Sequence, residues 1–169
     1  MSRSSLLAFA RPVSHALLAG ALMIAPVVAQ AQTRMVPQLT LDGARRIVTG
    51  AEAEAARNGW VVSIAIVDAA GGLVLFQRAD DAAPSSLDLS LGKARTAARF
   101  RRPTKALEET IAGGRSTLLA LEGIVPLEGG LPIVVDGVVV GAVGVSGVTS
   151  AQDAQIAQAG LAAMAVPRR

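Results

Sequence analysis

The chain has 169 residues, with 16 basic and 13 acidic side chains, a net charge of +3 and only 2% aromatic residues. This length suits one domain with a substantial core, whereas the near balance of charge and the scarcity of aromatic rings argue against a nucleic-acid-binding surface. Cysteine and tyrosine are absent and the single histidine is His15, which excludes disulfides, thiolate metal sites and a cysteine nucleophile.

The first 31 residues have the pattern of a secretory signal peptide. Arg3 and Arg11 form a basic start, residues 16–28 are apolar, and a small-x-small triplet ends at Ala31. We predict cleavage after Ala31, a periplasmic or secreted protein, and no stable membrane insertion after cleavage. An uncleaved anchor is the alternative, although the apolar run is shorter than the roughly 20 residues that a membrane helix needs. Cleavage removes His15 and leaves 14 basic against 13 acidic residues, a net charge of +1.

After this leader, residues 32–38 read as a loose lead-in, residues 39–166 as a single domain and residues 167–169 as a tail. Thr40 is expected to cap a helix that stops at Asn58-Gly59. Its small and apolar residues recur at helical spacing, as expected for a helix that covers a sheet.

Two strands should follow, at residues 60–67 and 73–78, because both segments are rich in Val, Ile and Leu. Asp68 starts the turn between them. Its carboxylate is a candidate catalytic group, but we favour a turn residue whose side chain bonds nearby backbone.

The helix expected over residues 86–102, before Pro103, carries the first candidate site residues. Lys93, Thr96 and Phe100 share one face at i, i+3 and i+7. The opposite stripe should pack on the sheet and consists of Leu87, Leu91, Ala94 and Ala98.

A phenylalanine opposite the core needs a second partner, either a ligand or another subunit. The same helix concentrates positive charge, including Arg99 and Arg102. This charge is either a solvated basic face or a site for carboxylates or phosphate, which arginine binds through paired hydrogen bonds.

The next segments are less regular. A short helix is expected over residues 104–112, residues 115–121 are ambiguous, and residues 124–127 are a possible short strand. Glu128-Gly129-Gly130 then leads into a hairpin.

This hairpin joins residues 131–135 and 138–145 through Asp136-Gly137, a pair suited to a two-residue turn. Gly141 and Gly144 lie inside the second strand, where glycine indicates a bulge or a close approach of backbone or ligand. Ser146-Gly147 ends the strand. Ser150 to Asp153 then has the spacing of a capping box at the start of a last helix, residues 150–165.

In this order, the motifs resemble the GlcG/HbpS-like family, also called the haem-degrading or DUF336 domain. The resemblance covers roughly residues 39–165. It rests on the segments 81–85 (DAAPS), 93–100 (KARTAARF), 129–133 (GGLPI) and 136–147 with its glycines, and on Asp153.

The resemblance implies an α+β fold with a five-stranded antiparallel sheet covered by helices, profilin-like in outline. It also implies a homo-oligomer and, for some members, haem as the ligand. Haem iron usually takes imidazole, thiolate, thioether or phenolate ligands. In the cleaved chain the candidates are Met35, Met164, Lys93, an oxygen of Thr96 or Thr104, or water. Alternatively, apolar contacts hold the porphyrin while Arg99 or Arg102 binds its propionates.

Three functions remain open from the sequence. The first is an exported haem-binding or haem-handling protein that is non-catalytic or weakly catalytic. The second is an enzyme or binding protein for a small organic acid. For such a protein, Lys93, Arg99 or Arg115 would hold the carboxylate of the ligand. Asp153 or Glu128 would act as the base. Backbone N–H groups of Gly129-Gly130 and of residues Gly144 to Gly147, including Ser146, would face an oxyanion. The third is an accessory structural oligomer with no ligand.

Overall fold

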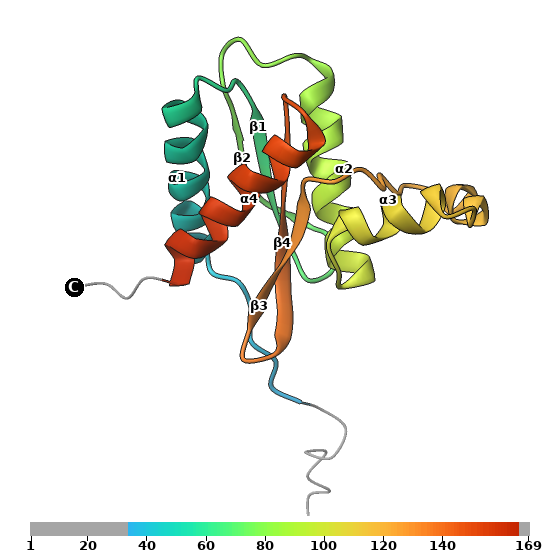
Figure 1. Ribbon diagram of the computed structural model, residues 1–169. Coiled ribbons are helices and arrows are strands. Elements are labelled where there is room, and N and C mark those ends of the chain that lie inside the picture. Colours follow the sequence, from blue (N-terminus) through green and yellow to red (C-terminus); the bar gives the residue numbers. More distant parts are fainter. Residues whose placement is uncertain (1–33, 166–169) are drawn as a thin grey trace, which may run out of the picture. The chain divides into compact units, whose positions relative to one another are not determined.

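The computed structural model describes residues 34–165, so the predicted signal peptide and the tail at residues 167–169 lie outside the described residues. No helix within residues 34–165 is both long and apolar enough to cross a membrane. The elements are α1 (Leu41–Asn58), β1 (Ser63–Asp68), β2 (Leu73–Arg78), α2 (Ser85–Phe100), α3 (Thr104–Ala112), the 3-10 helix η2 (Ser116–Ala120), β3 (Gly130–Val135), β4 (Val138–Ser146) and α4 (Ser150–Ala165) (Figure 1).

The described residues form one antiparallel sheet of four strands in the order β2-β1-β4-β3. The α+β class is confirmed, but the expectation of five strands is wrong for residues 34–165. Residues 124–127 do not form the extra strand. The backbone N–H groups of Val125 and Glu128 bond to side chains instead of a neighbouring strand, and Pro126 has no N–H to donate.

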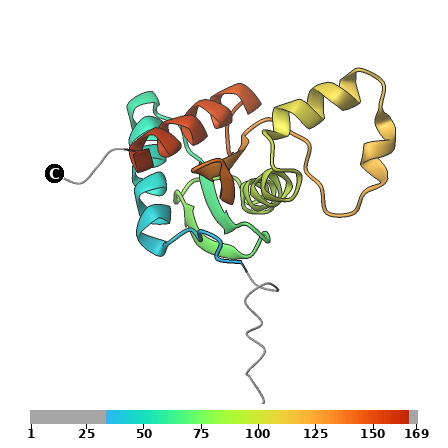
Figure 2. The same cartoon turned by 90° about the horizontal axis from the view of Figure 1, so that it is seen from below.

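Helices cover both faces of the sheet, as the view in Figure 2 shows. On one face, α1 and α4 pack against a core that includes Ile64, Ile66 and Val143. On the other face, α2 packs through small side chains, with Ala94 and Ala97 against Ala65 in the sheet. Of the stripe predicted for α2, Ala94 and Ala98 are buried and Leu91 is partly buried, whereas Leu87 is 40% exposed.

The second face is built for close contact between helix and sheet. A Cβ placed on Gly144 would lie 2.1 Å from the backbone oxygen of Ser90 and 2.5 Å from the backbone nitrogen of Ala94, both in α2. Gly144 therefore lets the α2 backbone lie directly on β4. The close approach predicted for this glycine is confirmed, and protein backbone accounts for it.

Several local predictions are also confirmed. Asp136 and Gly137 have φ angles of 49° and 77°, which a two-residue hairpin turn of this kind requires. The Asp68 carboxylate accepts hydrogen bonds from the backbone N–H groups of Ala70 and Gly72, both at 2.8 Å, so it acts as a turn residue. Thr40 caps α1 as expected, since its Oγ1 accepts from the Gly43 N–H at 3.1 Å.

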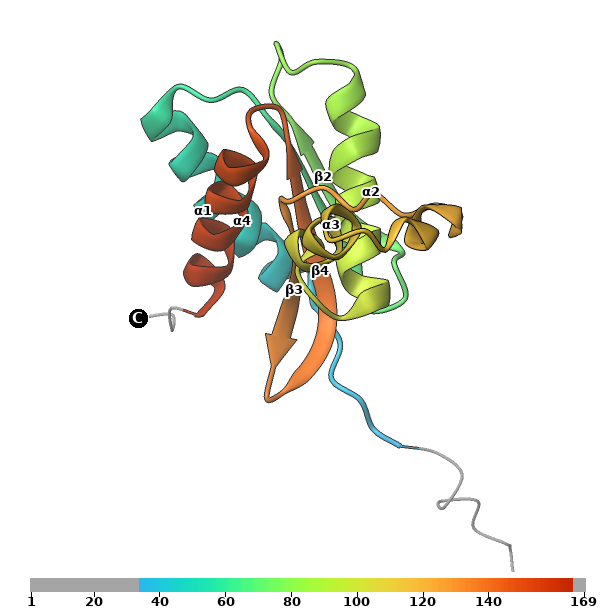
Figure 3. The same ribbon diagram turned by 45° about the vertical axis from the view of Figure 1, so that its right-hand side comes forward.

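Residues 104–128, hereafter the arm, contain α3 and η2 and extend away from the sheet (Figures 1 and 3). The end of the arm returns to α2. The Thr96 Oγ1 accepts from the Val125 N–H at 2.8 Å, and a Cβ on Gly92 would lie only 2.4 Å from the Val125 side chain. The arm is thus anchored on α2 by its last residues.

Candidate functional site

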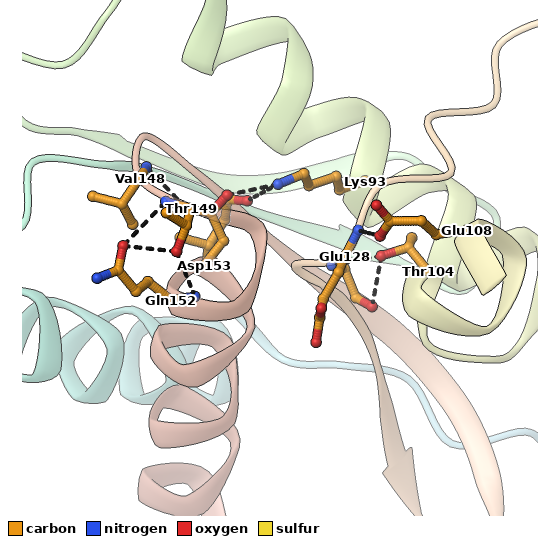
Figure 4. Close-up of polar contacts among 10 residues, drawn as sticks. Lys93, Thr104, Glu108, Glu128, Val148, Thr149, Gln152 and Asp153 are labelled. Atoms are coloured by element: carbon orange, nitrogen blue, oxygen red, sulfur yellow. Dashed lines mark hydrogen bonds and ion pairs between the residues drawn. The ribbon is translucent and has the colours of Figure 1, made fainter. Parts of the chain in front are cut away.

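An ion pair between α2 and α4 is buried at the centre of the predicted site (Figure 4). Lys93 Nζ lies 2.7 Å from Asp153 Oδ2, and the two side chains are 3% and 2% exposed. The ammonium also donates to the backbone oxygen of Val145, at 3.1 Å. Lys93 therefore joins α2 to both β4 and α4, and the prediction that it lies on the face away from the core is wrong.

Asp153 does not have the capping role that was predicted. The capping box lies one residue earlier. Thr149 Oγ1 accepts from the Gln152 N–H at 3.4 Å, and Gln152 Oε1 accepts from the Thr149 N–H at 3.1 Å. The sequence Thr149-Ser-Ala-Gln152 matches the capping pattern as well as Ser150 to Asp153 does. This shift leaves the Asp153 side chain free to turn inward.

The environment of Asp153 favours its neutral form more than water does. Burial raises the pKa of the Asp153 carboxyl above its ordinary value, and the hydrogen bond and charge of Lys93 and the Val148 N–H oppose this rise. Asp153 Oδ1 accepts from that Val148 N–H at 3.2 Å. The charge of Lys93 thus compensates that of the carboxylate at Oδ2, and the Val148 N–H donates to its other oxygen, Oδ1.

The two glycines before β3 lie against this ion pair. A Cβ on Gly129, whose φ is 122°, would lie 2.8 Å from Asp153 Cβ and 2.9 Å from Lys93 Nζ. A Cβ on Gly130 would lie 2.5 Å from the Lys93 backbone oxygen. Glycine at these positions therefore allows the chain to pass over the buried pair.

The predicted oxyanion site does not form as expected around these glycines. The Gly130 N–H donates to Thr104 Oγ1 at 2.9 Å, a bond that is fully buried, and so does not face a ligand. Ser146 ends β4 and is 5% exposed. Glu128, a candidate base, is paired through its carboxylate with Lys105 Nζ at 2.9 Å. These contacts tie the Gly130 N–H and the Glu128 carboxylate to partners within the protein.

The structure therefore divides the predicted site residues into two groups. Lys93, Thr96, Gly129, Gly130 and Ser146 are interior residues that hold α2, α4, β4 and the arm together. Arg99 and Arg115 are exposed, on α2 and at the start of η2, and Phe100 is half-buried at the end of α2.

Two partners in this region were not among the predicted site residues. Asp153 was considered only as part of a capping box or as a base, and Thr104 as an iron ligand. Nothing local predicts the Lys93 to Asp153 contact, because the two residues are 60 positions apart.

One cavity lies elsewhere, between α1 and the β1–β2 edge of the sheet. It measures about 210 Å³ and includes Glu52, Trp60 and Gln77 in its lining. This volume is below the roughly 300–1,000 Å³ of sites that enclose a drug-sized ligand. None of the predicted site residues lines it.

Comparisons with known proteins agree on one family. A family model described as "Haem degrading protein HbpS-like" matches residues 39–162. Protein GlcG of Escherichia coli K12 is 48% identical over 105 residues, which cover 62% of this chain and 78% of GlcG.

Two solved structures extend the comparison to the fold. A double mutant of HbpS from Streptomyces reticuli aligns with a TM-score of 0.74 and 35% identity, over 82% of this chain and 95% of that one. A complex of PduOC with haem aligns with a TM-score of 0.70 and 28% identity, over 75% of this chain and 95% of that one.

Proposed function

Because the chain belongs to the HbpS-like family of haem-degrading proteins, we propose that it handles haem by binding it reversibly on the outer surface between α2 and the arm. We further propose that it acts after export, as a non-catalytic or weakly catalytic protein. One observation carries the assignment of the surface: an unpaired arginine of α2 lies beside Gly123, in a segment of the arm that carries exposed leucines.

The basic part of this surface is Arg99 with its neighbour Arg95, one helical turn away. Arg95 Nε donates to the backbone oxygen of Gly71 at 3.2 Å, which fixes that side chain. Arg99 is exposed and makes no hydrogen bond or ion pair within residues 34–165. Its guanidinium is thus available for a propionate, which it can bind through two parallel hydrogen bonds.

The apolar part is the stretch of the arm around Gly123. A Cβ on Gly123 would lie 3.5 Å from Arg99 Nη1, so the guanidinium lies close to this part of the arm. Nearby in the sequence, the side chains of Leu119, Leu121 and Leu127 are 58%, 48% and 40% exposed. An exposed cation close to a segment that carries exposed leucines matches the chemistry of haem, which has carboxylates at one edge and an apolar face.

The described residues fit the porphyrin better than they fit its iron. They include no histidine, cysteine or tyrosine, and no group of three carboxylate side chains that would hold a metal ion. Lys93, Thr96 and Thr104, which were candidate ligands, are buried and engaged with protein atoms. We therefore assign no step to iron chemistry.

We also propose that the protein is a homo-oligomer. The exposed leucines of the arm are apolar side chains that a second subunit would remove from water. Haem at this surface would then lie near a subunit boundary, and column elution at several protein concentrations would give the subunit count.

Haem titration of the purified protein and three variants tests the proposed binding surface. Arg99→Gln should weaken binding about threefold to tenfold, because an exposed guanidinium contributes modestly to binding a carboxylate. Leu121→Gln should also weaken it, about fivefold, through lost apolar contact. Arg45→Gln removes an exposed, unpaired arginine from α1 and should leave the affinity unchanged.

A saturable Soret change that is equal in the Arg99 and Arg45 variants would place the haem elsewhere on the protein. No saturable change in the unaltered protein would refute the proposed function. Export has its own test, which is recovery of the protein from the periplasm or medium with Gln32 as its first residue.

A further inference from the structure

We infer that this protein recognises the porphyrin and not its metal, so that metal-free porphyrin binds about as well as haem. The inference rests on the proposed function. It follows from which candidate iron ligands the sequence contains and from where those within residues 34–165 lie.

The usual side chains that bind haem iron are His, Cys, Met and Tyr. The chain has no cysteine or tyrosine, and its one histidine, His15, belongs to the predicted signal peptide. Of the methionines in the described part, Met35 is fully exposed in the lead-in. Met164 lies near the end of α4 and packs on the core shared with α1, on the side of the sheet away from α2. Met164 therefore does not lie at the proposed surface, and Met35 is the one solvent-exposed methionine of the described part.

Lysine does not replace them. The chain has only two lysines, and both are in ion pairs. Lys93 Nζ is sealed against Asp153 and Val145, so exposing it would leave the Asp153 carboxylate buried without its counter-ion. Lys105 Nζ lies 2.9 Å from Glu128 Oε2, in an exposed ion pair. Iron would therefore have to compete with the Glu128 carboxylate for this ammonium group.

A second subunit adds no new kind of donor. In a homo-oligomer the partner surface is built from the same sequence, which again brings no cysteine or tyrosine and only His15. Apart from Met35, which is fully exposed in the lead-in, the candidate donors are therefore the same for a monomer and for a site between subunits. Water completes the coordination of iron equally well in solution and on the protein, so it adds little to affinity.

The remaining contributions come from the organic part of the ligand. Arg99 binds a propionate, and the leucines around Gly123 cover part of the macrocycle. Both contacts are the same whether the centre of the ring holds iron, zinc or two protons. Porphyrins that keep their carboxylates should therefore form one ligand class for this protein.

The test compares haem, zinc protoporphyrin and metal-free protoporphyrin by equilibrium dialysis against the full chain. We expect their dissociation constants to agree within about threefold, a small part of any binding free energy. The dimethyl ester of protoporphyrin, which lacks free carboxylates, should bind more weakly. The ferric haem complex should give a high-spin electron paramagnetic resonance signal, as expected for water as the axial ligand.

Three variants identify a ligand if the inference fails. Haem that binds more than about tenfold tighter than metal-free protoporphyrin overturns it. Loss of that preference in His15→Ala, Met35→Leu or Met164→Leu names the responsible side chain, and its persistence in all three points to another donor. Haem binding without protoporphyrin binding refutes the inference alone, whereas no binding of any porphyrin refutes the proposed function.

Discussion

Replacing Lys93 with methionine tests whether the buried ion pair holds the two layers of helices together. Methionine keeps the length of the side chain but removes the ammonium that contacts Asp153 at 2.7 Å and Val145 at 3.1 Å. Both side chains are almost fully buried, so the carboxylate left behind cannot be hydrated. Removing one partner of such a pair costs about 3–5 kcal/mol, and we expect a loss of that size at pH 8.

The loss should shrink as the pH falls. Burial raises the pKa of Asp153, and without Lys93 the main opposing charge is gone. A carboxyl with a raised pKa in the folded state stabilises the fold below its unfolded pKa, and this contribution is lost as the pH rises through the folded pKa. The Lys93→Met variant should therefore be closer to the unaltered protein at pH 5 than at pH 8.

Urea unfolding followed by the fluorescence of Trp60, the single tryptophan, measures these differences. The double variant Lys93→Met, Asp153→Leu should recover most of the lost stability, because an apolar pair leaves no charge unpaired. Two results would refute the reasoning: a Lys93→Met protein as stable as the original at pH 8, or a double variant less stable than Lys93→Met.

Three further predictions concern close packing, a helix cap and a buried hydrogen bond. Gly144→Ala places a Cβ 2.1 Å from a backbone oxygen of α2 and should cost more than about 2 kcal/mol of unfolding free energy. In Gly137→Ala the added Cβ has no atom within 4 Å, so the substitution should cost only about 1 kcal/mol, because of the left-handed φ at this position. Equal losses of unfolding free energy in Gly144→Ala and Gly137→Ala would contradict the close-packing argument. Thr149→Ala should lower the melting temperature, because losing this helix cap costs about 1 kcal/mol, whereas Ser150→Ala should change the melting temperature little. A larger effect of Ser150→Ala than of Thr149→Ala would show that Ser150 is the cap, as predicted from the sequence. Thr104→Val leaves the N–H of Gly130, the first residue of β3, without its partner and should lower the free energy of unfolding by about 1–2 kcal/mol. An unchanged urea midpoint would refute this prediction.

The parts of the fold that were predicted correctly depend on neighbours in the sequence. The Asp136-Gly137 turn and the Asp68 turn are set by backbone conformation and by bonds that span at most four residues. The arm could not be predicted in this way. Its end is held by side chains of Thr96 and Glu108, which lie 29 and 20 residues from their partners.

The interior site was missed for a related reason. Helical spacing correctly placed Lys93 and Thr96 on one face, but it could not show that this face turns toward the sheet. Ser86, Ser90 and Ala97 extend the same buried stripe, and their small size was the available signal. A charged lysine within this stripe implied a partner, but its identity required the three-dimensional structure.

The order of the strands limits when this protein can fold during its synthesis. The first strand, β1, pairs on one side with β2 and on the other with β4, which ends at Ser146. The first helix, α1, packs on the last, α4. A ribosome that has reached Val135 has therefore made neither the strand that joins the two halves of the sheet nor the cover for α1. The emerging chain has to remain incomplete until its last segments appear, and a premature stop in β4 should yield no folded domain.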